Sequence, residues 1–309
     1  MQTRTTPRIG LIGCGLWGGN ILSDLQVLGA STMVVDVDPL ARERAIQSGA
    51  IMAVGDASEL SGIDGWVVAT PARIHLHSIE TVVAHGAPIL CEKPLTASLD
   101  EARAISAMLK SPLHVMDVWR YHPAVERMKS IVTSGELGAV HGVRSARANW
   151  TSPRVDVDTV WNLAPHDISI YRELFDVFPV PVAALAECID GQARSLWSHW
   201  SKQPWMVSEL SNRYSTRRRE LSLHCERGVA LFDGDKPGVI EIASGAADER
   251  LEASERLVVS IGSETALQRQ LADWLGFLAG GQAPRSDLEH ATRVIALVEQ
   301  VRSLAGLDQ

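Results

Sequence analysis

The stretch RIGLIGCGLWG, residues 8–18, decides the fold of the first part of the chain. It begins with an apolar run typical of a buried strand and ends in GCGLWG, which has the spacing G-x-G-x-x-G. This spacing alone is weak evidence, because an ordinary tight glycine turn also explains it. Its context favours a dinucleotide site, since a helical stretch follows and Asp36 ends the next apolar strand.

Each glycine of this turn has its own expected role. Gly13 permits the turn, Gly15 lets the backbone approach a pyrophosphate, and Gly18 allows the helix to pack closely on the strand. Leu16 and Trp17 begin the helix, whose N-terminus favours phosphate groups, and both are predicted cofactor contacts.

Asp36 determines which dinucleotide we expect. Its carboxylate would accept hydrogen bonds from the adenosine ribose and would repel a 2′-phosphate, so NAD is favoured over NADP. Arg42 and Arg44 would oppose this preference, but they fall inside the next predicted helix and are expected to face solvent.

Strand and helix patterns alternate as far as residue 118. Apolar strands are expected at 8–13, 31–37, 65–70, 87–93 and 113–118, with helical segments between them. This alternation predicts a parallel, doubly wound α/β sheet of the Rossmann type.

The pattern changes after residue 119. Two helical segments are followed by short alternating runs separated by Gly, Pro, Asp and Ser, and two more helices end the chain. The short runs indicate a mostly antiparallel sheet that is open on one face. We therefore predict a dinucleotide-binding domain over 1–119 and an α+β domain for substrate binding and oligomerisation over 120–309.

The composition argues against several classes of protein. The chain has 309 residues and a net charge of −8, which disfavours nucleic acid and anionic membranes as partners. Its four cysteines form no C-x-x-C pair and fit no common zinc site, so we expect reduced thiols and no metal. With no signal-peptide pattern and no apolar run of membrane-spanning length, a cytoplasmic location is expected.

ATPARIH (69–75) follows the third predicted strand. Ligands of open α/β sheets lie beyond the carboxyl ends of strands, so Ala69, Thr70, Pro71 and His75 are candidate cofactor contacts. A strand-to-helix turn marked by proline explains the same residues without a ligand.

CEKPL (91–95) follows the fourth predicted strand. It places Glu92 and the ammonium group of Lys93 at the same rim of the sheet, braced by Pro94. A lone lysine is usually a solvated surface residue, so the position, not the residue type, makes Lys93 a candidate.

VWNLAPHDIS (160–169) places Asn162 and His166 at helical i and i+4 spacing. If a helix begins here, both side chains lie on one face of its first turn, where Pro165 is tolerated. The pair is either a catalytic dyad or a helix cap followed by a core histidine, since Asn is a good N-cap.

Several segments, taken in order, resemble the glucose–fructose oxidoreductase / inositol dehydrogenase / MocA (Gfo/Idh/MocA) family. They are GCGLWG, VVDVDP, ATPARIH, CEKPL, VWRYHPAVERMKSIVTSGELG and WNLAPHD, and they span most of residues 8–175. The resemblance implies an NAD-dependent dehydrogenase of a sugar, polyol or nucleotide sugar. WNLAPHD and RRRELSLHCERGVALFDG look closest to dehydrogenases of sugars and sugar nucleotides, including those that oxidise the 3-hydroxyl of an N-acetylated nucleotide sugar.

The resemblance also implies roles for single residues. Lys93 matches the catalytic lysine and the cofactor contact of the family, and His166 matches the catalytic histidine. Asn162 stands where many members have an aspartate, so we expect a lower pKa for His166 than a carboxylate would give. Asn162 then binds a substrate hydroxyl, or Lys93 takes more of the acid–base work. Arg120 and Tyr121 match the stretch that lines nicotinamide and substrate.

Two other functions stay open at this point. A regulatory protein would bind NAD and a sugar without turnover; Lys93 and His166 argue against it, and Asn162 argues for it. An enzyme with tightly held NAD would exchange hydride between sugars, or cleave glycosides by oxidation and elimination.

Weaker patterns concern the second domain. The run Arg217–Arg219 is consistent with a phosphate site but is more typical of a solvated hairpin. Trp197, Trp200 and Trp205 are typical of a buried sheet face, with sugar stacking or a subunit interface as alternatives. Flat open sheets pair subunits in the family, so a homodimer or homotetramer is expected.

Overall fold

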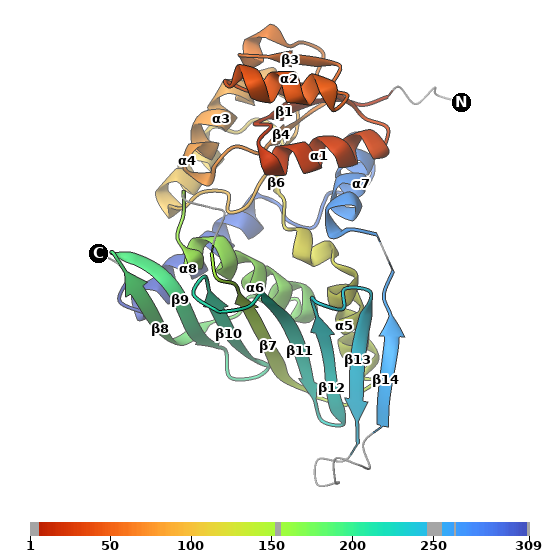
Figure 1. The fold of residues 1–309 in the computed structure, drawn as a ribbon, viewed down its shortest axis with the longest axis vertical. Helices are drawn as coiled ribbons and strands as arrows, with labels where there is room; N and C mark the ends of the chain where they lie inside the picture. Colours follow the sequence, from red (N-terminus) through yellow and green to blue (C-terminus); the bar gives the residue numbers. More distant parts are fainter. Residues whose placement is uncertain (1–5, 152–155, 246–254, 263, 308–309) are drawn as a thin grey trace. The chain divides into compact units, whose positions relative to one another are not determined.

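The structure is a computed structural model that describes residues 6–151, 156–245, 255–262 and 264–307 (Figure 1). The chain forms two compact units. Unit 1 comprises Met1–Val118 and Thr265–Ile295, and unit 2 comprises Trp119–Glu264 and Ala296–Gln309. Among the described residues, no helix is both long enough and apolar enough to cross a membrane.

Unit 1 is built on a parallel sheet, as the alternating pattern predicted. Its strands are β1 (Arg8–Ile12), β2 (Ser31–Val35), β3 (Met52–Val54), β4 (Gly65–Val68), β5 (Ile89–Cys91) and β6 (Leu113–Val115). Their order within the described sheet is β3-β2-β1-β4-β5-β6, so the direction of winding reverses between β1 and β4. That reversal is where doubly wound sheets bind dinucleotides. The edge strand β3 was not predicted, because it has only three residues and none of them is buried.

Helices pack against this sheet and give it a continuous core. They are α1 (Leu16–Val27), α2 (Pro39–Gln47), α3 (His75–Val82), α4 (Leu99–Met108) and α7 (Ala266–Leu278), with the short helices η1 (Ala57–Glu59), η2 (Ala72–Ile74) and η3 (Val83–His85). The central strands carry fully buried residues such as Ile9, Leu11 and Val67. Their nearly uninterrupted apolar character follows from burial on both faces.

Helix α7 belongs to unit 1, although the sequence places all of 120–309 in the second domain. Its Leu271 and Trp274 lie in the same core cluster as Ile9 and Leu11. A Cβ atom on Gly65 of β4 would come within 2.8 Å of Trp274, so the helix lies flush on the sheet. The predicted division near residue 119 therefore assigns 265–295 to the wrong unit. This segment joins the core of unit 1 only through tertiary packing, which the local sequence pattern does not record.

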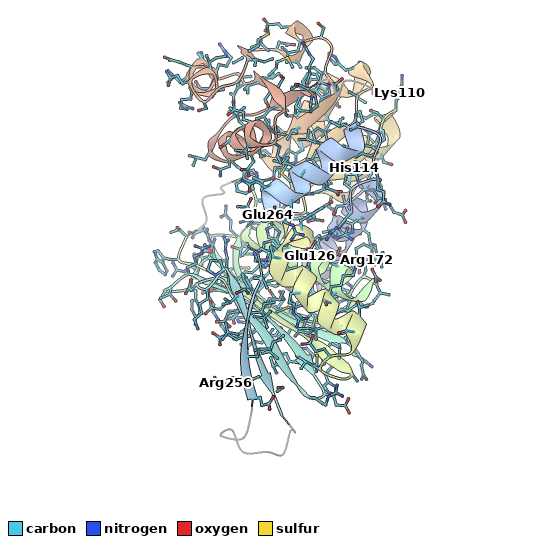
Figure 2. All side chains as sticks on the ribbon, turned by 90° about the vertical axis from the view of Figure 1, so that its right-hand side faces the viewer. Lys110, His114, Glu126, Arg172, Arg256 and Glu264 are labelled. Carbon is cyan, nitrogen blue, oxygen red and sulfur yellow. The ribbon has the colours of Figure 1, made fainter. Side chains whose placement is uncertain are left out.

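Figure 2 shows His114 of β6 beside α7. Its ring lies edge-on to Phe277 of that helix, with the centroids 5.1 Å apart. The first part of α8 (Leu288–Leu304) also belongs to unit 1, where His290 Nε2 lies 2.9 Å from a carboxylate oxygen of Asp117. The remaining residues of α8 belong to unit 2.

Unit 2 is built on a mostly antiparallel sheet, as predicted. Its strands are β7 (Val140–Ala148), β8 (Pro181–Ile189), β9 (Gln192–Trp200), β10 (Trp205–Ser211), β11 (Arg218–Cys225), β12 (Gly228–Asp233), β13 (Val239–Ser244) and β14 (Glu255–Ser260). Within the described residues their order is β14-β13-β12-β11-β7-β10-β9-β8. Only the pairing of β7 with β10 is parallel among these described strands.

Two helices, α5 (Pro123–Ser134) and α6 (Thr159–Phe175), lie on one side of this sheet, and the short helix η4 (Val118–Tyr121) precedes them. Figure 2 shows this arrangement, with Glu126 on α5 and Arg172 on α6. The covered face buries Trp200, whereas Leu185 and Trp197 on the other face remain 66% and 43% exposed. The two tryptophans thus lie on opposite faces of one strand, and the open face predicted from the sequence is present.

Helix α6 begins earlier than the sequence suggests. Its N-cap is Asp158, whose carboxylate accepts hydrogen bonds from the N–H groups of Val160 and Trp161. Asn162 therefore lies inside the helix, and of the two alternatives left open by the sequence, the one in which it caps the helix is wrong. Pro165 lies in the helix interior and not in its first turn. Because proline has no backbone N–H group, Pro165 cannot donate a hydrogen bond to the carbonyl oxygen of Trp161. This missing hydrogen bond is the local cost of the proline.

Candidate active site

The glycine turn after β1 has the geometry of a dinucleotide-binding turn. Gly13 has a φ of +86°, and a Cβ atom there would lie 3.0 Å from the backbone carbonyl of Ala69. A Cβ on Gly18 would lie 2.2 Å from the carbonyl oxygen of Gly13, so only glycine allows this approach of helix to strand. A Cβ on Gly15 would meet nothing within 4 Å, which leaves the backbone open to a ligand.

The N-terminus of α1 is suited to an anion. Its N-cap is Gly15, no side chain caps it, and its first turn carries no acidic residue. The uncapped N–H groups and the positive end of the helix dipole therefore favour a phosphate group. Leu16 and Trp17, both predicted cofactor contacts, are 93% and 43% exposed at this end of the helix.

Asp36 follows β2 directly and faces the glycine turn. One carboxylate oxygen accepts from the backbone N–H of Cys14 at 2.7 Å, and the other accepts from that of Asp38 at 2.9 Å. A carboxylate offers about four lone-pair sites, so each oxygen retains one site for a ribose hydroxyl. Burial raises the pKa of the neighbouring Cys14 thiol, and the charge of Asp36 raises it further.

The two arginines that would favour NADP are held elsewhere. Arg42 is half-buried and donates to the backbone carbonyls of Asp36 and Val37, at 2.8 and 3.1 Å. Arg44 is exposed and lies 3.6 Å from the carboxylate of Asp38. The expectation of solvent exposure is therefore met for Arg44 but not for Arg42, which folds back onto the end of β2.

The turn after β4 lies against the glycine turn. The N–H of Ala69 donates to the carbonyl of Ile12, and Thr70 is bonded through its hydroxyl to Ser78 at 2.9 Å. Ala69 and Thr70 are partly exposed and Pro71 is exposed, so all three remain available to a ligand.

His75 has a different place from the one predicted, because it is completely buried. Its ring nitrogens lie 2.8 Å from the carbonyl oxygen of Thr70 and 3.0 Å from those of Pro94 and Leu95. With no exposed surface, His75 joins the two turns from behind and is not placed to contact a cofactor itself.

Glu92 connects the lysine turn to the glycine turn. Its carboxylate accepts a hydrogen bond from the indole N–H of Trp17 and another, at 2.9 Å, from the backbone N–H of Lys93. Lys93 is half-buried, and the peptide bond between Lys93 and Pro94 is cis. Because β1, β4 and β5 end at the same edge of the sheet, the unit brings all three predicted turns together there.

Unit 2 contains the remaining predicted residues, Arg120, Tyr121, Asn162 and His166. Asn162 and His166 both lie on α6, one turn apart and on the same face. His166 is 8% exposed, and its ring lies edge-on to that of Trp119, with the centroids 6.4 Å apart. Trp119 also stacks on His122 at 4.6 Å. His166 therefore lies in an aromatic setting with a small accessible surface.

A buried ion pair lies next to His166 in the sequence. Asp167 accepts hydrogen bonds from Arg147 at 2.6 Å, from Ser145 at 2.7 Å, and from Ser208. The guanidinium group of Arg147 in turn lies 4.0 Å from the centre of the Trp119 ring. The sequence did not reveal this network, because its members come from separate strands and a helix.

Arg120 and Tyr121 are buried, at 8% and 3% exposure. The guanidinium group of Arg120 lies 2.9 Å from a carboxylate oxygen of Glu173, whose other oxygen lies 3.1 Å from Lys129. Arg120, predicted as a cofactor contact, therefore also joins η4 to α6. No cluster of three or more His, Cys, Asp or Glu side chains suited to a metal ion occurs in the part of the chain that the structure describes.

The sequence of the first part of the chain matches a known family. Residues 7–118 match the family model GFO_IDH_MocA, described as "Oxidoreductase family, NAD-binding Rossmann fold". Residues 7–118 of unit 1 are accordingly similar to the NAD-binding Rossmann domain of an oxidoreductase family. Over these residues the chain is similar to the Gfo/Idh/MocA family, in line with the resemblance of its motifs.

Curated relatives agree with this family. The inositol 2-dehydrogenase of Rhodococcus erythropolis is 29% identical over 189 residues, which are 57% of this chain and 55% of the relative. The rhizopine catabolism protein MocA of Rhizobium meliloti is 28% identical over 44% of this chain and 45% of the relative. The chain thus spans about half the length of these relatives. A longer match, 26% identical over 87% of this chain and 84% of the relative, is an inositol 2-dehydrogenase of Corynebacterium glutamicum.

Solved structures share the whole fold. A levoglucosan dehydrogenase in complex with NADH has a TM-score of 0.83 at 17% identity and covers 98% of this chain and 97% of that one. The UDP-N-acetylglucosamine 3-dehydrogenase GnnA of Acidithiobacillus ferrooxidans has a TM-score of 0.82 at 22% identity, with 99% and 100% covered. At these identities the likeness concerns the fold.

Proposed function

We propose that the protein is an NAD-dependent dehydrogenase that transfers a hydride between NAD and a secondary hydroxyl group of a sugar, polyol or nucleotide sugar. The observation that carries the proposal is the edge of the sheet in unit 1. There an open glycine turn, the Asp36 carboxylate and the Lys93 turn follow adjacent or nearby parallel strands. The names of the curated relatives and of the solved structures, which include inositol, levoglucosan and nucleotide-sugar dehydrogenases, support this substrate class.

Unit 1 holds the residues that fit the cofactor. Asp36 would receive the two ribose hydroxyls, and the uncapped start of α1 would receive the pyrophosphate. Ala69, Thr70, Pro71 and the Glu92–Lys93 turn would line the rest. Bound NAD supplies the hydride acceptor. Because a carboxylate at Asp36 repels a 2′-phosphate, NAD is the preferred dinucleotide and NADP the weaker one.

Lys93 and His166 are the proposed acid–base residues. If His166 takes the proton of the reacting hydroxyl group, the ammonium group of Lys93 stabilises negative charge on the oxygen. If Lys93 takes this proton, it acts as the neutral amine and becomes the ammonium group in the same step. Asn162, one turn before His166 on the same helix face, has an amide that would hydrogen-bond a substrate hydroxyl or the imidazole. Tyr121 and Arg120 are proposed to shape the surroundings, although both are largely buried.

The division of labour between the units is part of the proposal. Unit 1 binds the dinucleotide, and unit 2 binds the substrate and pairs with another copy of the chain. The open face of the unit 2 sheet supports pairing, because Leu185, Trp197 and Val207 are 66%, 43% and 40% exposed there. Exposed apolar patches of this kind mark protein interfaces. We propose a homodimer or homotetramer in the cytoplasm.

A screen tests the activity. The purified protein would be mixed with NAD, and separately with NADP, and absorbance of the reduced nicotinamide followed with neutral sugars, polyols, sugar acids and nucleotide sugars. NAD reduction by one sugar class is expected. The proposal is contradicted if no compound reduces NAD although a thermal shift shows that NAD binds. That result would favour a regulatory protein that binds NAD without turnover, or an enzyme whose tightly held NAD is reduced and reoxidised within each catalytic cycle.

His166→Gln tests the proposed acid–base role. General acid–base groups typically contribute about 10²- to 10⁴-fold, so kcat is expected to fall by that factor with NADH affinity retained. The pH–rate profile should lose one of its limbs as well. An unchanged profile and rate would remove His166 from the mechanism.

A further inference from the structure

The covered face of the unit 2 sheet carries two arginines directly opposite each other. Arg147 of β7 is paired in register with Arg219 of β11. Directly opposed residues of antiparallel strands have Cβ atoms about 5 Å apart and lie on the same face. Arg147 contacts Asp167 of α6, and Leu221 and Leu223 of β11 are buried on the same side, so Arg219 also faces the helices.

Like charges in this arrangement repel each other and destabilise a sheet unless something compensates them. Arg147 is compensated by the Asp167 carboxylate at 2.6 Å and by the face of Trp119 at 4.0 Å. Two serine hydroxyl groups also bind the oxygens of Asp167, so its charge is already shared. The network leaves Arg219 outside it.

Arg219 has a different environment. Among the described residues, no carboxylate forms an ion pair with its guanidinium group. The side chain of Arg219 is exposed to solvent, although nearby protein atoms partly desolvate it and so lower its pKa; the neighbouring charges of Arg217 and Arg147 lower the pKa further. By contrast, Arg218, on the opposite face of the same strand, is paired with both Glu209 and Glu220. The charge of Arg218 is thus balanced by two carboxylates, whereas Arg219 lies beside the like charges of Arg147 and Arg217.

The location of this charge matters for the reaction. Arg147 lies over Trp119, whose ring is edge-on to His166. The Arg147–Arg219 pair therefore lies on the same side of unit 2 as His166, the proposed acid–base residue. The ring of Trp119 lies between Arg147 and His166. A planar guanidinium group binds carboxylates and phosphates through paired hydrogen bonds.

We infer that Arg219, supported by the charges of Arg147 and Arg217, forms a subsite in unit 2 for an anionic group of the substrate, a carboxylate or a phosphate. The inference rests on the proposed function, since it names the sugars that this enzyme would take. They are acidic sugars or sugars that carry a phosphate, and an uncharged sugar would bind without using the subsite.

Calorimetric titration of the full chain would test the subsite at low ionic strength. The probes are sodium glucuronate, glucose 6-phosphate and neutral glucose. The variants are Arg219→Gln, which removes the charge, Arg219→Lys, which keeps it, and Arg256→Gln. Arg256 is an exposed arginine of β14, labelled in Figure 2, and serves as a control with the same change in net charge.

Arg219→Gln is expected to raise the Kd of at least one anionic sugar about 10- to 100-fold, as for loss of a hydrogen bond to a charged group. Arg219→Lys should retain more of the affinity, and Arg256→Gln should behave like the unmodified protein. Glucose binding should not change. The preferred probe distinguishes a carboxylate subsite from a phosphate subsite.

The inference is overturned if Arg219→Gln binds both anionic sugars as well as the unmodified protein does, or if it loses glucose affinity equally. It is also overturned if the unmodified protein prefers neither anionic probe over glucose. Failure of the proposed function gives another result: anionic sugars bind through Arg219, yet no NAD is reduced. NAD reduction by neutral sugars at a rate independent of Arg219 would instead retain the dehydrogenase and remove the subsite.

Discussion

Replacement of Asp36 by alanine should abolish the preference for NAD over NADP. The carboxylate has one lone-pair site left on each oxygen after it binds the N–H groups of Cys14 and Asp38. Two ribose hydroxyl groups of NAD would fill these sites. At the low end of about 1.5 kcal/mol for each hydrogen bond to a charged group, they contribute about 3 kcal/mol.

NADP would keep only one of these hydrogen bonds. Its 2′-phosphate, with a charge of about −2, would also be repelled by about 1.5 kcal/mol at roughly 5 Å in water. The free energy of the one remaining hydrogen bond and that of the repulsion cancel, so Asp36 contributes almost nothing to NADP binding. The intact protein should therefore favour NAD by about 3 kcal/mol, or about 100-fold in Kd. In Asp36→Ala the affinity for NAD should fall about 100-fold, that for NADP should hardly change, and the two should become nearly equal.

The assay is the Kd of each reduced dinucleotide, measured by fluorescence, together with KM where turnover is found. Asp38→Ala is the matched control, because Asp38 caps α2 through the N–H of Leu40 and lies next to Arg44 without being the residue that faces the ribose. The reasoning is refuted if Asp36→Ala keeps its preference for NAD. It is equally refuted if Asp38→Ala loses the preference to the same extent, since loosening of the loop would then explain both.

Three further predictions follow from single contacts. Lys93→Met should lower kcat about 10³-fold or more while the Kd of NADH changes little, and full turnover would exclude the proposed role of Lys93. Glu173→Ala removes the carboxylate beside buried Arg120 and should cost about 3–5 kcal/mol of unfolding free energy in urea. The double variant with Arg120→Leu should recover part of this loss, and a purely additive result would count against the pair. Burial lowers the pKa of His114 below 6.5, so its stabilisation is present above that pH and is lost as the pH falls through the lower, folded pKa. Between pH 7.5 and 5 the Tm should therefore fall less in His114→Gln than in the unmodified protein, and exposed His77→Gln should not show this difference.

The glycine turn shows how far local sequence reaches. Gly13, Gly15 and Gly18 were given separate roles from their spacing and from the strand and helix around them, and the structure has a positive φ, an open approach and a close helix contact at those positions. Such features depend on a few consecutive residues and on the absence of a Cβ atom. The alternation of apolar strands and helices was equally sufficient for the parallel sheet, because burial on both faces imposes a pattern that a short window of sequence records.

Helix α6 shows where local reasoning fails. Asn and Asp are both good N-caps, and sequence alone did not favour Asp158 over Asn162. The structure selects Asp158, and the helix then runs through Pro165 because packing of its buried residues outweighs the local cost of a proline. His75 is a similar case, since its complete burial depends on turns after β4 and β5 that are distant in sequence.

The sequence by itself therefore predicted the alternating strands and helices of unit 1, the glycine turn, and the positions of Asp36, Lys93 and His166 along the chain. Only the tertiary structure decided the return of α7 to the first core and the pairing of Arg147 with Arg219 across two strands. The reason is physical. Periodicity and turn chemistry act between near neighbours, whereas core completion and cross-strand charge pairs join residues that only the folded chain brings together.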